Sequence, residues 1–204
     1  MAARRTTQPP GEPPKPYHHG ALREALLAAA ERILERDGMV GLTLRAAARE
    51  AGASHAAPKN HFGDVAGLLS ELAAVGFDRF TGRMLAAASD QPTPQARLNA
   101  IGRAYVDFAV ANPGLFQSMF RGERLDTERP ALRAAMAGSY QVLTGAVAAA
   151  HPGEGSKGAA VARAWSMVHG YAMLLLDGRL DPLLGDQTGG PDPARLLDAM
   201  LALD

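Results

Sequence analysis

Apolar residues recur at helical spacing from about residue 21 onward. The first segment is expected to form a helix from Ala21 to about Asp37, where Gly38 stops it. Its apolar positions step by four, three and four residues and so share one face: Leu22, Leu26, Ala29 and Ile33. No stretch of the chain alternates apolar and polar residues over the length of a strand, and alanine and leucine dominate. The pattern predicts an all-α protein.

Six further amphipathic segments follow residue 64, and each is opened by a capping residue, a proline or a polar turn. The longest begins after a cap at Asp64 and reaches about Ala87, with Gly76 as a weak point in its middle. The others begin after Thr93-Pro94, Asn112-Pro113, Pro130, residues 151–158 and Asp192-Pro193. Together with three helices before residue 64, the pattern predicts about nine helices.

Residues 43–62 have the pattern of a helix-turn-helix. Thr43 is a suitable N-cap for the first of its two helices. Gly52 supplies the left-handed residue that ends this helix. A narrow stripe of small apolar residues, which lets another helix approach closely, runs along it: Leu44, Ala47, Ala48 and Ala51.

The second helix of this pair is expected from His55 to about Phe62, with Ser54 as its N-cap. Pro58 would then occupy the fourth helical position and cost one backbone hydrogen bond. A cap one residue later would avoid this cost, so the start of the helix stays open by at least one residue at this point.

Charge is spread unevenly along the chain of 204 residues. Lys+Arg and Asp+Glu both number 21, so the formal net charge is zero, which is unusual for a generic nucleic-acid-binding domain. Residues 1–63, however, hold nine Lys or Arg and six Asp or Glu. The basic part therefore coincides with the helix-turn-helix, although uneven surface charge without a function is the alternative interpretation.

The N-terminal residues are expected to form a disordered, basic and proline-rich arm. Residues 1–16 contain five of the 14 prolines together with Arg4, Arg5 and Lys15. They lack the apolar stretch of a signal peptide, and no later segment is a good membrane helix. We therefore expect a cytoplasmic protein without a membrane partner. Arginine exceeds lysine by 18 to three and alanine and glycine are abundant, which suggests a GC-rich bacterial source.

No catalytic motif stands out in the sequence. The absence of cysteine excludes cysteine nucleophiles and Cys-ligated zinc. The segment Gly52–Ala56 lacks the second glycine of a nucleophile elbow, and residues 153–158 lack the Lys-Ser/Thr ending of a phosphate-binding loop. His55 and His61 are six positions apart and fall on different helix faces. We expect no enzyme activity, no cofactor and no metal site.

A set of aromatic and methionine residues between Phe77 and Met173 suits a cavity for a small apolar or aromatic molecule. For any single member, ordinary core packing is the simpler interpretation. His169 and Tyr171 could supply polar groups, although His169 could equally lie in the core bonded to a backbone carbonyl. Besides Phe77, the predicted ligand-binding residues are Met84, Tyr105, Phe108, Phe116, Met119, Phe120, Met136, Tyr140, Trp165, His169 and Met173.

The segment from Thr43 to Phe62, TLRAAAREAGASHAAPKNHF, resembles the DNA-binding domain of the tetracycline-repressor (TetR) family of bacterial transcriptional regulators. Leu34 and Asp37-Gly38 before it, and Leu68-Leu69 after it, extend the resemblance. Residues 111–116 and 165–178 are similar to the C-terminal domain of a TetR subfamily with a Trp/His/Gly signature. The resemblance implies a helix-turn-helix domain over residues 17–64, joined by a long helix to an effector-binding and dimerisation domain over residues 65–204.

The resemblance further implies a homodimer that reads a palindromic operator in double-stranded DNA and a repressor that an unknown small effector releases. Thr43 and Ser54 match positions at the phosphate backbone, and Phe62 matches an aromatic residue that locks the domain. The resemblance and the polar residues next to the matched positions together give the following predicted DNA contacts: Thr43, Arg45, Ser54, His55, Ala56, Ala57, Lys59, Asn60 and His61. We expect the helix around residues 159–177 and the final helix to form most of the dimer interface.

Three positions depart from the family pattern. Lys59 stands where the family has tyrosine, Asn60 where it often has arginine, and Val65 where it usually has lysine. Lys59 can make a charge-assisted phosphate contact and Asn60 can pair with adenine, whereas Val65 loses a contact. Two hypotheses follow: a ligand-responsive DNA-binding regulator, and a small-molecule-binding helical dimer with a degenerate DNA-binding surface.

Overall fold

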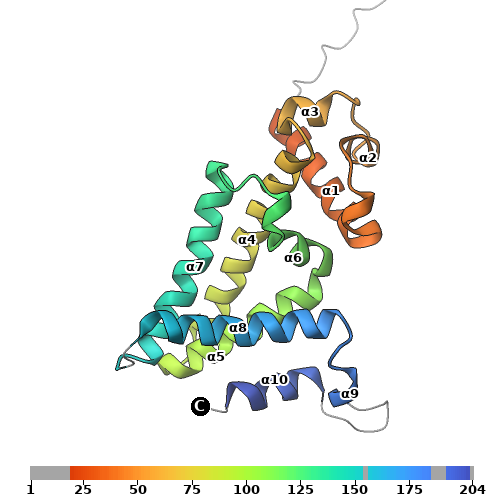
Figure 1. Cartoon of the computed structure of the whole chain (residues 1–204). Coiled ribbons are helices and arrows are strands. Elements are labelled where there is room, and N and C mark those ends of the chain that lie inside the picture. Colours follow the sequence, from red (N-terminus) through yellow and green to blue (C-terminus); the bar gives the residue numbers. More distant parts are fainter. Residues whose placement is uncertain (1–18, 154–155, 185–191, 203–204) are drawn as a thin grey trace, which may run out of the picture.

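The computed structural model describes residues 19–153, 156–184 and 192–202. Within these ranges the protein contains ten α-helices, one short 3-10 helix and no strand, so the prediction of an all-α fold is confirmed (Figure 1). The predicted arm and His18 lie outside the described residues. The elements are α1 (His19–Gly41), α2 (Leu44–Glu50), α3 (Ala57–Phe62), α4 (Val65–Ser89), α5 (Pro94–Ala111), α6 (Pro113–Met119), η1 (Gly122–Arg124), α7 (Pro130–Ala150), α8 (Lys157–Leu176), α9 (Asp181–Leu184) and α10 (Pro193–Leu201).

The α-helix that sequence periodicity missed is α9, a single turn of four residues. The 3-10 helix η1, with three residues, was missed for the same reason. A pattern that repeats every three or four residues cannot show itself within one turn. The expected count of about nine helices is therefore one short among the described residues.

Side-chain caps mark several of the predicted helix starts, although the predicted cap Asn112 makes no such bond at the start of α6. Each of these side chains accepts a hydrogen bond from a backbone N–H that the first helical turn leaves without a partner. The donors lie at 3.0 Å from Thr43, 2.7 Å from Asp64, 3.1 Å from Thr93 and 3.2 Å from Asp192. Ser156 caps α8 in the same way, so this helix begins two residues before the predicted Ala159.

The start of α3 differs from the prediction. Ser54 is not the N-cap; Ala56 takes that place without a side-chain hydrogen bond, and the backbone oxygen of Ser54 accepts from Ala57 N at 3.0 Å. The physical reason is Pro58, which has no N–H to donate and is tolerated only in the first turn of a helix. Gly52 does end α2 with a φ of 65°, as predicted.

Two other glycines in the N-terminal half act differently from each other. Gly38 interrupts α1 with a φ of 66°, although the helix is resumed as far as Gly41. Helix α4 passes through Gly76 unbroken. Met119 of α6 packs against α4 at this point, and a Cβ on Gly76 would lie 2.7 Å from its Sδ atom.

Helices α1 to α3 gather at one end of the molecule, and α4 leads from them into the larger group of helices (Figure 1). Helix α7 runs beside α4 in the same direction, because Arg129 lies near Gly67 and Ser139 lies beside Thr81. Helix α8 crosses the lower part of this group, and α10 lies along α5 through Gly102 and Leu201. No helix among the described residues has both the length and the hydropathy to span a membrane.

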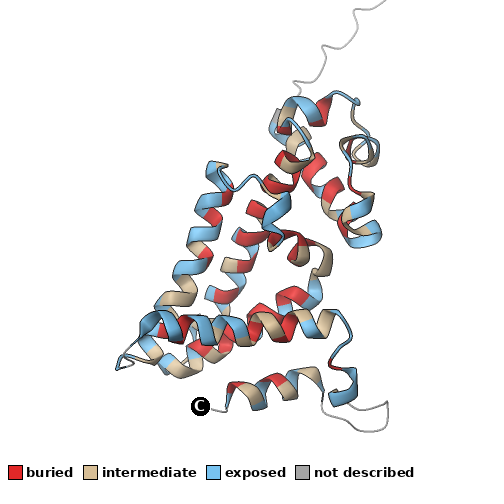
Figure 2. Cartoon of the chain, viewed as in Figure 1, coloured by how far each residue is buried: buried red, intermediate tan, exposed pale blue. Residues whose placement is uncertain are grey.

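The hydrophobic core is continuous across this arrangement. One cluster of buried residues includes Phe62 of α3, Leu68 of α4, and Phe108 and Phe116 of the larger helical group (Figure 2). Burying one such large apolar side chain contributes about 1.5–3 kcal/mol. The helix-turn-helix is therefore packed directly onto the helices that surround the cavity described below.

Candidate DNA-binding surface and effector cavity

Helix α3 presents the candidate DNA-binding residues on its outer face. Lys59 and Asn60 are exposed and His61 is half-buried, whereas Phe62 on the inner face is only 1% exposed. The guanidinium of Arg23 lies 5.9 Å from the Phe62 ring centre, so the aromatic ring is held between α1 and the core. The buried ring fixes the orientation of this short helix.

Most of the other predicted DNA-contacting residues also reach the surface. Those exposed to solvent are Thr43, Arg45, Ser54, His55 and Ala56. Ala57 is different: it is 7% exposed and packs in the core, so its methyl group faces inward at the start of α3. Its neighbour Pro58 is buried as well, so the first turn of α3 packs against the core.

Charge on the helix-turn-helix is partly neutralised and partly free. Arg32 binds Glu50 at 3.0 Å and Arg36 binds Asp37 at 2.8 Å. These hydrogen bonds hold the pKa of Glu50 and of Asp37 below their usual values, so both carboxylates stay ionised. The side chains of Arg45 and Lys59, by contrast, form no ion pair or hydrogen bond with any residue in the described ranges, which leaves their charges available to phosphate.

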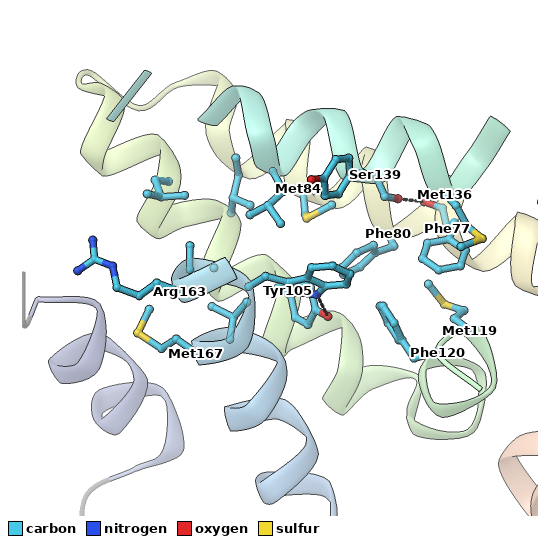
Figure 3. Close-up of a pocket in the computed structure, with 18 of the residues that line it drawn as sticks. Phe77, Phe80, Met84, Tyr105, Met119, Phe120, Met136, Ser139, Arg163 and Met167 are labelled. Atoms are coloured by element: carbon cyan, nitrogen blue, oxygen red, sulfur yellow. Dashed lines mark hydrogen bonds between the residues drawn. The ribbon is translucent and has the colours of Figure 1, made fainter. Parts of the chain in front are cut away.

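A cavity of about 670 Å³ lies among α4, α5, α7 and α8 (Figure 3). Its volume falls in the range of small-molecule sites, and apolar side chains, among them many aromatic and methionine residues, form most of its wall. Seven of the predicted ligand-binding residues line it: Met84, Tyr105, Met119, Phe120, Met136, Tyr140 and Trp165. Phe77, from the same predicted set, also lies in the wall.

Four predicted ligand-binding residues lie behind this wall. Phe108 and Phe116 are buried, and their rings pack against Phe80, with centres 5.2 and 6.5 Å away. Met173 packs against the core, and His169 supports Tyr105 from behind. These side chains shape the cavity through the lining residues that they contact.

The polar groups at the centre of the cavity are paired with one another. Tyr105 Oη lies 2.7 Å from His169 Nδ1, and Trp165 Nε1 donates to Tyr105 Oη at 3.3 Å. Burial lowers the pKa of His169 and raises that of Tyr105, so both groups are neutral. In the imidazole tautomer that leaves Nδ1 without a proton, the tyrosine O–H donates to it. The hydrogen-bond partner of His169 is therefore the side chain of Tyr105 and not the backbone carbonyl that sequence reasoning gave as the alternative. Tyr105 Oη therefore has polar partners from two side chains of α8.

The end of the cavity far from the helix-turn-helix is more polar. Gln95, Asn99, His151 and Arg163 line the cavity, and Arg163 points away from the aromatic end in Figure 3. Sequence reasoning missed this end because polar residues near helix termini resemble ordinary surface. A signal was present, since Gln95 and Asn99 are four residues apart and so share one face of α5.

Helix α6 ties the cavity to α1. Its first two residues after the proline, Gly114 and Leu115, donate backbone N–H groups to the carboxylate of Glu35 at 3.0 and 2.9 Å. The last residue of α6, Met119, lines the cavity together with the adjoining Phe120. A residue of the first helix therefore caps a helix that forms part of the cavity wall.

These features define a helix-turn-helix protein with a separate helical domain that encloses an apolar cavity. Residues 98–203 match the family described as "Tetracyclin repressor-like, C-terminal domain". The chain belongs to this tetracycline-repressor (TetR) family. The match does not distinguish a Trp/His/Gly subfamily, so that narrower assignment stays a prediction.

Comparison with individual proteins agrees with the family. A Rhodococcus sp. RHA1 protein of unknown function shares 36% identity and a TM-score of 0.77, covering 92% of this chain and 95% of the other. The transcriptional regulator FadR of Bacillus subtilis, solved with stearoyl-CoA, shares the fold at 16% identity and a TM-score of 0.67, over 87% of this chain and 95% of its own.

A curated relative is also similar in sequence. The uncharacterized HTH-type transcriptional regulator YobS of Bacillus subtilis (strain 168) is 26% identical over 99 residues, which are 48% of this chain and 51% of YobS. The alignment therefore spans about half the length of that relative.

Proposed function

We propose that the protein is a homodimeric, sequence-specific transcriptional regulator that binds a palindromic operator in double-stranded DNA. A small apolar or aromatic effector bound in the cavity releases it, so that it acts as a repressor. The observation that carries this proposal is the presence in one chain of an exposed helix-turn-helix with unneutralised Lys59 and Arg45 and of a large apolar cavity. Binding to chromosomal DNA would place it in the bacterial cytoplasm.

The exposed residues of α3 are proposed to make two kinds of contact with DNA, one to phosphate and one to a base. Lys59 supplies a charge-assisted contact to a phosphate, and the amide of Asn60 offers the donor and acceptor pair that adenine accepts in the major groove. Thr43, Arg45, Ser54 and His61 supply positioning contacts to the backbone, and His55 and Ala56 lie before α3 where they can approach base edges. Ala57, which is buried, has no direct role in this proposal.

On the effector side, the paired polar atoms of Tyr105, His169 and Trp165 leave an apolar central wall. Burying apolar ligand surface there is favourable without a desolvation cost for an unpaired protein donor. The polar end with Arg163 accommodates a polar group at one end of the effector. Long acyl chains are one class of effector to screen, since FadR, which has this fold, was solved with stearoyl-CoA.

The test is fluorescence anisotropy of labelled DNA from immediately upstream of the gene, with scrambled DNA as control, over roughly 50–200 mM salt. We expect selective binding that weakens with salt. Asn60→Ala should cost about 1–3 kcal/mol of binding free energy through the loss of contact with one base. Lys59→Ala should weaken binding to all sequences and lower the slope of log K against log salt concentration by about 1. Lys157→Ala, at the exposed start of α8, is the matched control.

Equal and feeble binding to both DNAs would favour the second hypothesis, a small-molecule-binding helical dimer whose DNA-binding surface has degenerated. Val65, half-buried against the core where the family usually has lysine, is the observation behind it. A selection from random DNA sequences would then decide. An enriched palindrome supports the regulator with an operator located elsewhere, and no enrichment supports the second hypothesis.

A further inference from the structure

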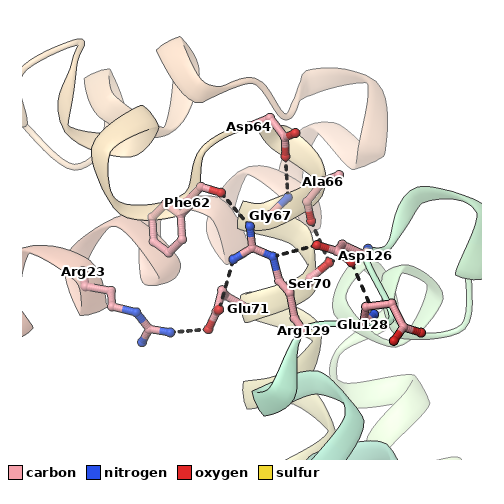
Figure 4. A network of polar contacts seen from close by, with 10 residues as sticks. All are labelled: Arg23, Phe62, Asp64, Ala66, Gly67, Ser70, Glu71, Asp126, Glu128 and Arg129. Atoms are coloured by element: carbon pink, nitrogen blue, oxygen red, sulfur yellow. Dashed lines mark hydrogen bonds and ion pairs between the residues drawn. The ribbon is translucent and has the colours of Figure 1, made fainter.

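The connection between α6 and α7 reaches both the cavity and the helix-turn-helix. We call residues 121–129 the connecting segment. It contributes Gly122, Leu125 and Thr127 to the cavity wall. It ends at Arg129, the N-cap residue of α7, whose side chain extends toward α3 (Figure 4). Arg129 is only four positions after the cavity-lining Leu125.

The guanidinium of Arg129 holds the end of the recognition helix. Its Nη2 donates to the backbone oxygen of Phe62, the last residue of α3, at 2.9 Å. Nη1 lies 3.3 Å from Glu71 Oε1 and Nε lies 3.4 Å from Asp126 Oδ2. The side chain of Arg129 is only 28% exposed. A charged donor on a carbonyl beyond the last helical hydrogen bond is a strong, partly buried contact.

The packing around this contact leaves little room for adjustment. A Cβ on Gly67 would lie 2.0 Å from the Phe62 oxygen and 2.4 Å from Arg129 Nη2. Glu71, which pairs with Arg129, also pairs with Arg23 of α1. The same cluster therefore joins α1, α3, α4 and the connecting segment (Figure 4).

A second anchor holds the connecting segment to α4. The backbone N–H of Asp126 donates to Ser70 Oγ at 2.8 Å, and Ser70 Oγ donates to the oxygen of Ala66 at 2.7 Å. Ser70 is fully buried. Asp126 stands between Leu125 and Thr127 in the cavity wall, so movement of the wall strains this hydrogen bond and the neighbouring Arg129 together.

We infer that Arg129 is the positioning residue that couples occupancy of the cavity to the recognition helix. A ligand that displaces Leu125 or Thr127 shifts the connecting segment, withdraws the guanidinium from the Phe62 oxygen and frees α3. The inference rests on the proposed function and names the route of its regulation. It requires that the ligand fit the shifted arrangement better than the one seen here.

The test needs no knowledge of the natural effector, because the chain contains no cysteine. Leu125→Cys creates a unique thiol in the cavity wall, and hexyl methanethiosulfonate attaches a six-carbon chain there as a covalent occupant. Hydrogen exchange then reports on α3 through the amides of Asn60 and Gly63, which donate to Ala56 O at 3.1 Å and Lys59 O at 2.9 Å.

With Arg129 present, attaching the hexyl chain should make these amides exchange about tenfold faster. In Leu125→Cys with Arg129→Ala, exchange should be fast already, and the label should add nothing. The matched control is Arg133→Ala, which removes an arginine one turn later that is 65% exposed and pairs with Glu128 at 3.5 Å. In that background the label should act as it does with Arg129 present.

Two results would overturn the inference: slow α3 exchange after labelling, or an equal response to the label in the Arg129→Ala background. Arg129→Lys, which keeps the charge but loses the forked geometry, replaces Arg129→Ala if the latter also speeds exchange in α5 and α8. Because exchange is measured without DNA, failure of operator binding would overturn the proposed function and leave this result standing.

Discussion

Tyr105 contacts both the hydrophobic core and the cavity. Its ring packs against Phe80 and Phe116, with ring centres at 4.8 and 5.6 Å, and its other side lines the cavity. Its hydroxyl is held by His169 and Trp165. Edge-on aromatic pairs of this kind contribute about 0.5–1.5 kcal/mol beyond area burial. Hydrogen bonds with His169 and Trp165 therefore hold Tyr105 in the cavity wall.

Protonation of His169 should destabilise the fold. Burial lowers its pKa, so the imidazole binds a proton more weakly in the folded than in the unfolded chain. The free energy of unfolding should then fall as the pH is lowered from about 7 to about 5. Urea unfolding should show a smaller loss over this range in His169→Gln, whose amide oxygen can still accept from Tyr105. An identical loss in both proteins would contradict the prediction.

Trp165 should report directly on ligand binding. It is the single tryptophan of the chain, it is partly exposed, and it lines the cavity. Titration with 8-anilino-1-naphthalenesulfonate should quench its emission as the dye's own fluorescence rises. Trp165→Phe should retain the rise in dye fluorescence. Dye binding that leaves the tryptophan emission unchanged would place the dye outside the cavity.

Among the elements, α3 and α6 are short helices that depend on their surroundings. Isolated helices of six or seven residues are unstable in water, so packing and capping must supply their stability. Helix α3 has Phe62 in the core and Arg129 on its last carbonyl. Helix α6 has the carboxylate of Glu35, since the Asn112 side chain points back to Phe108 O at 2.9 Å.

Removing the Glu35 carboxylate should therefore destabilise the protein. Its removal leaves two backbone N–H donors of α6 without their partner. Loss of a helix cap lowers the free energy of unfolding by about 0.5–2 kcal/mol. Glu35→Ala should lower the urea midpoint without changing the slope of the transition. Glu24→Ala, on the exposed face of the same helix and without an ion pair among the described residues, is the control and should be neutral. Equal effects of the two substitutions would argue against the cap.

Capping residues show how far local sequence reasoning reaches at this scale. Thr43, Asp64, Thr93 and Asp192 were assigned correctly because a cap acts within three residues of itself. Ser54 was assigned wrongly because Pro58, four residues later, decides where α3 can begin. Glu35 could not be assigned at all, since its partners lie about 80 residues away in sequence.

At the scale of the whole molecule, α8 links the cavity to the surface expected to form the dimer. Trp165 and Met167 of this helix line the cavity, while Leu174 is 46% exposed. An exposed leucine on a long helix is a plausible contact for a partner helix. That α8 and the final helix form most of the dimer interface stays a prediction, as do the boundaries of the two domains.

A charge on this face of α8 should prevent dimerisation. Leu174→Glu would bury a carboxylate in the interface, which is costly unless it is paired. Sedimentation at micromolar concentration should show a dimer for the natural sequence and a monomer for this variant. Leu85→Glu, an equivalent change at an exposed leucine of α4, should remain a dimer. A monomeric natural protein would contradict the prediction.

The sequence alone predicted every α-helix of the described residues except the single turn α9, together with most helix starts, the helix-turn-helix and much of the aromatic set around the cavity. Each of these depends on residues within one or two helical turns of each other, so periodicity and capping rules suffice. The tertiary structure decided which aromatic residues face the cavity and which lie behind it, as with Tyr105 and Phe116. It also decided that Arg129 meets Phe62 across 67 positions in the chain. Such contacts arise from the packing of whole helices, so a local sequence pattern cannot predict them.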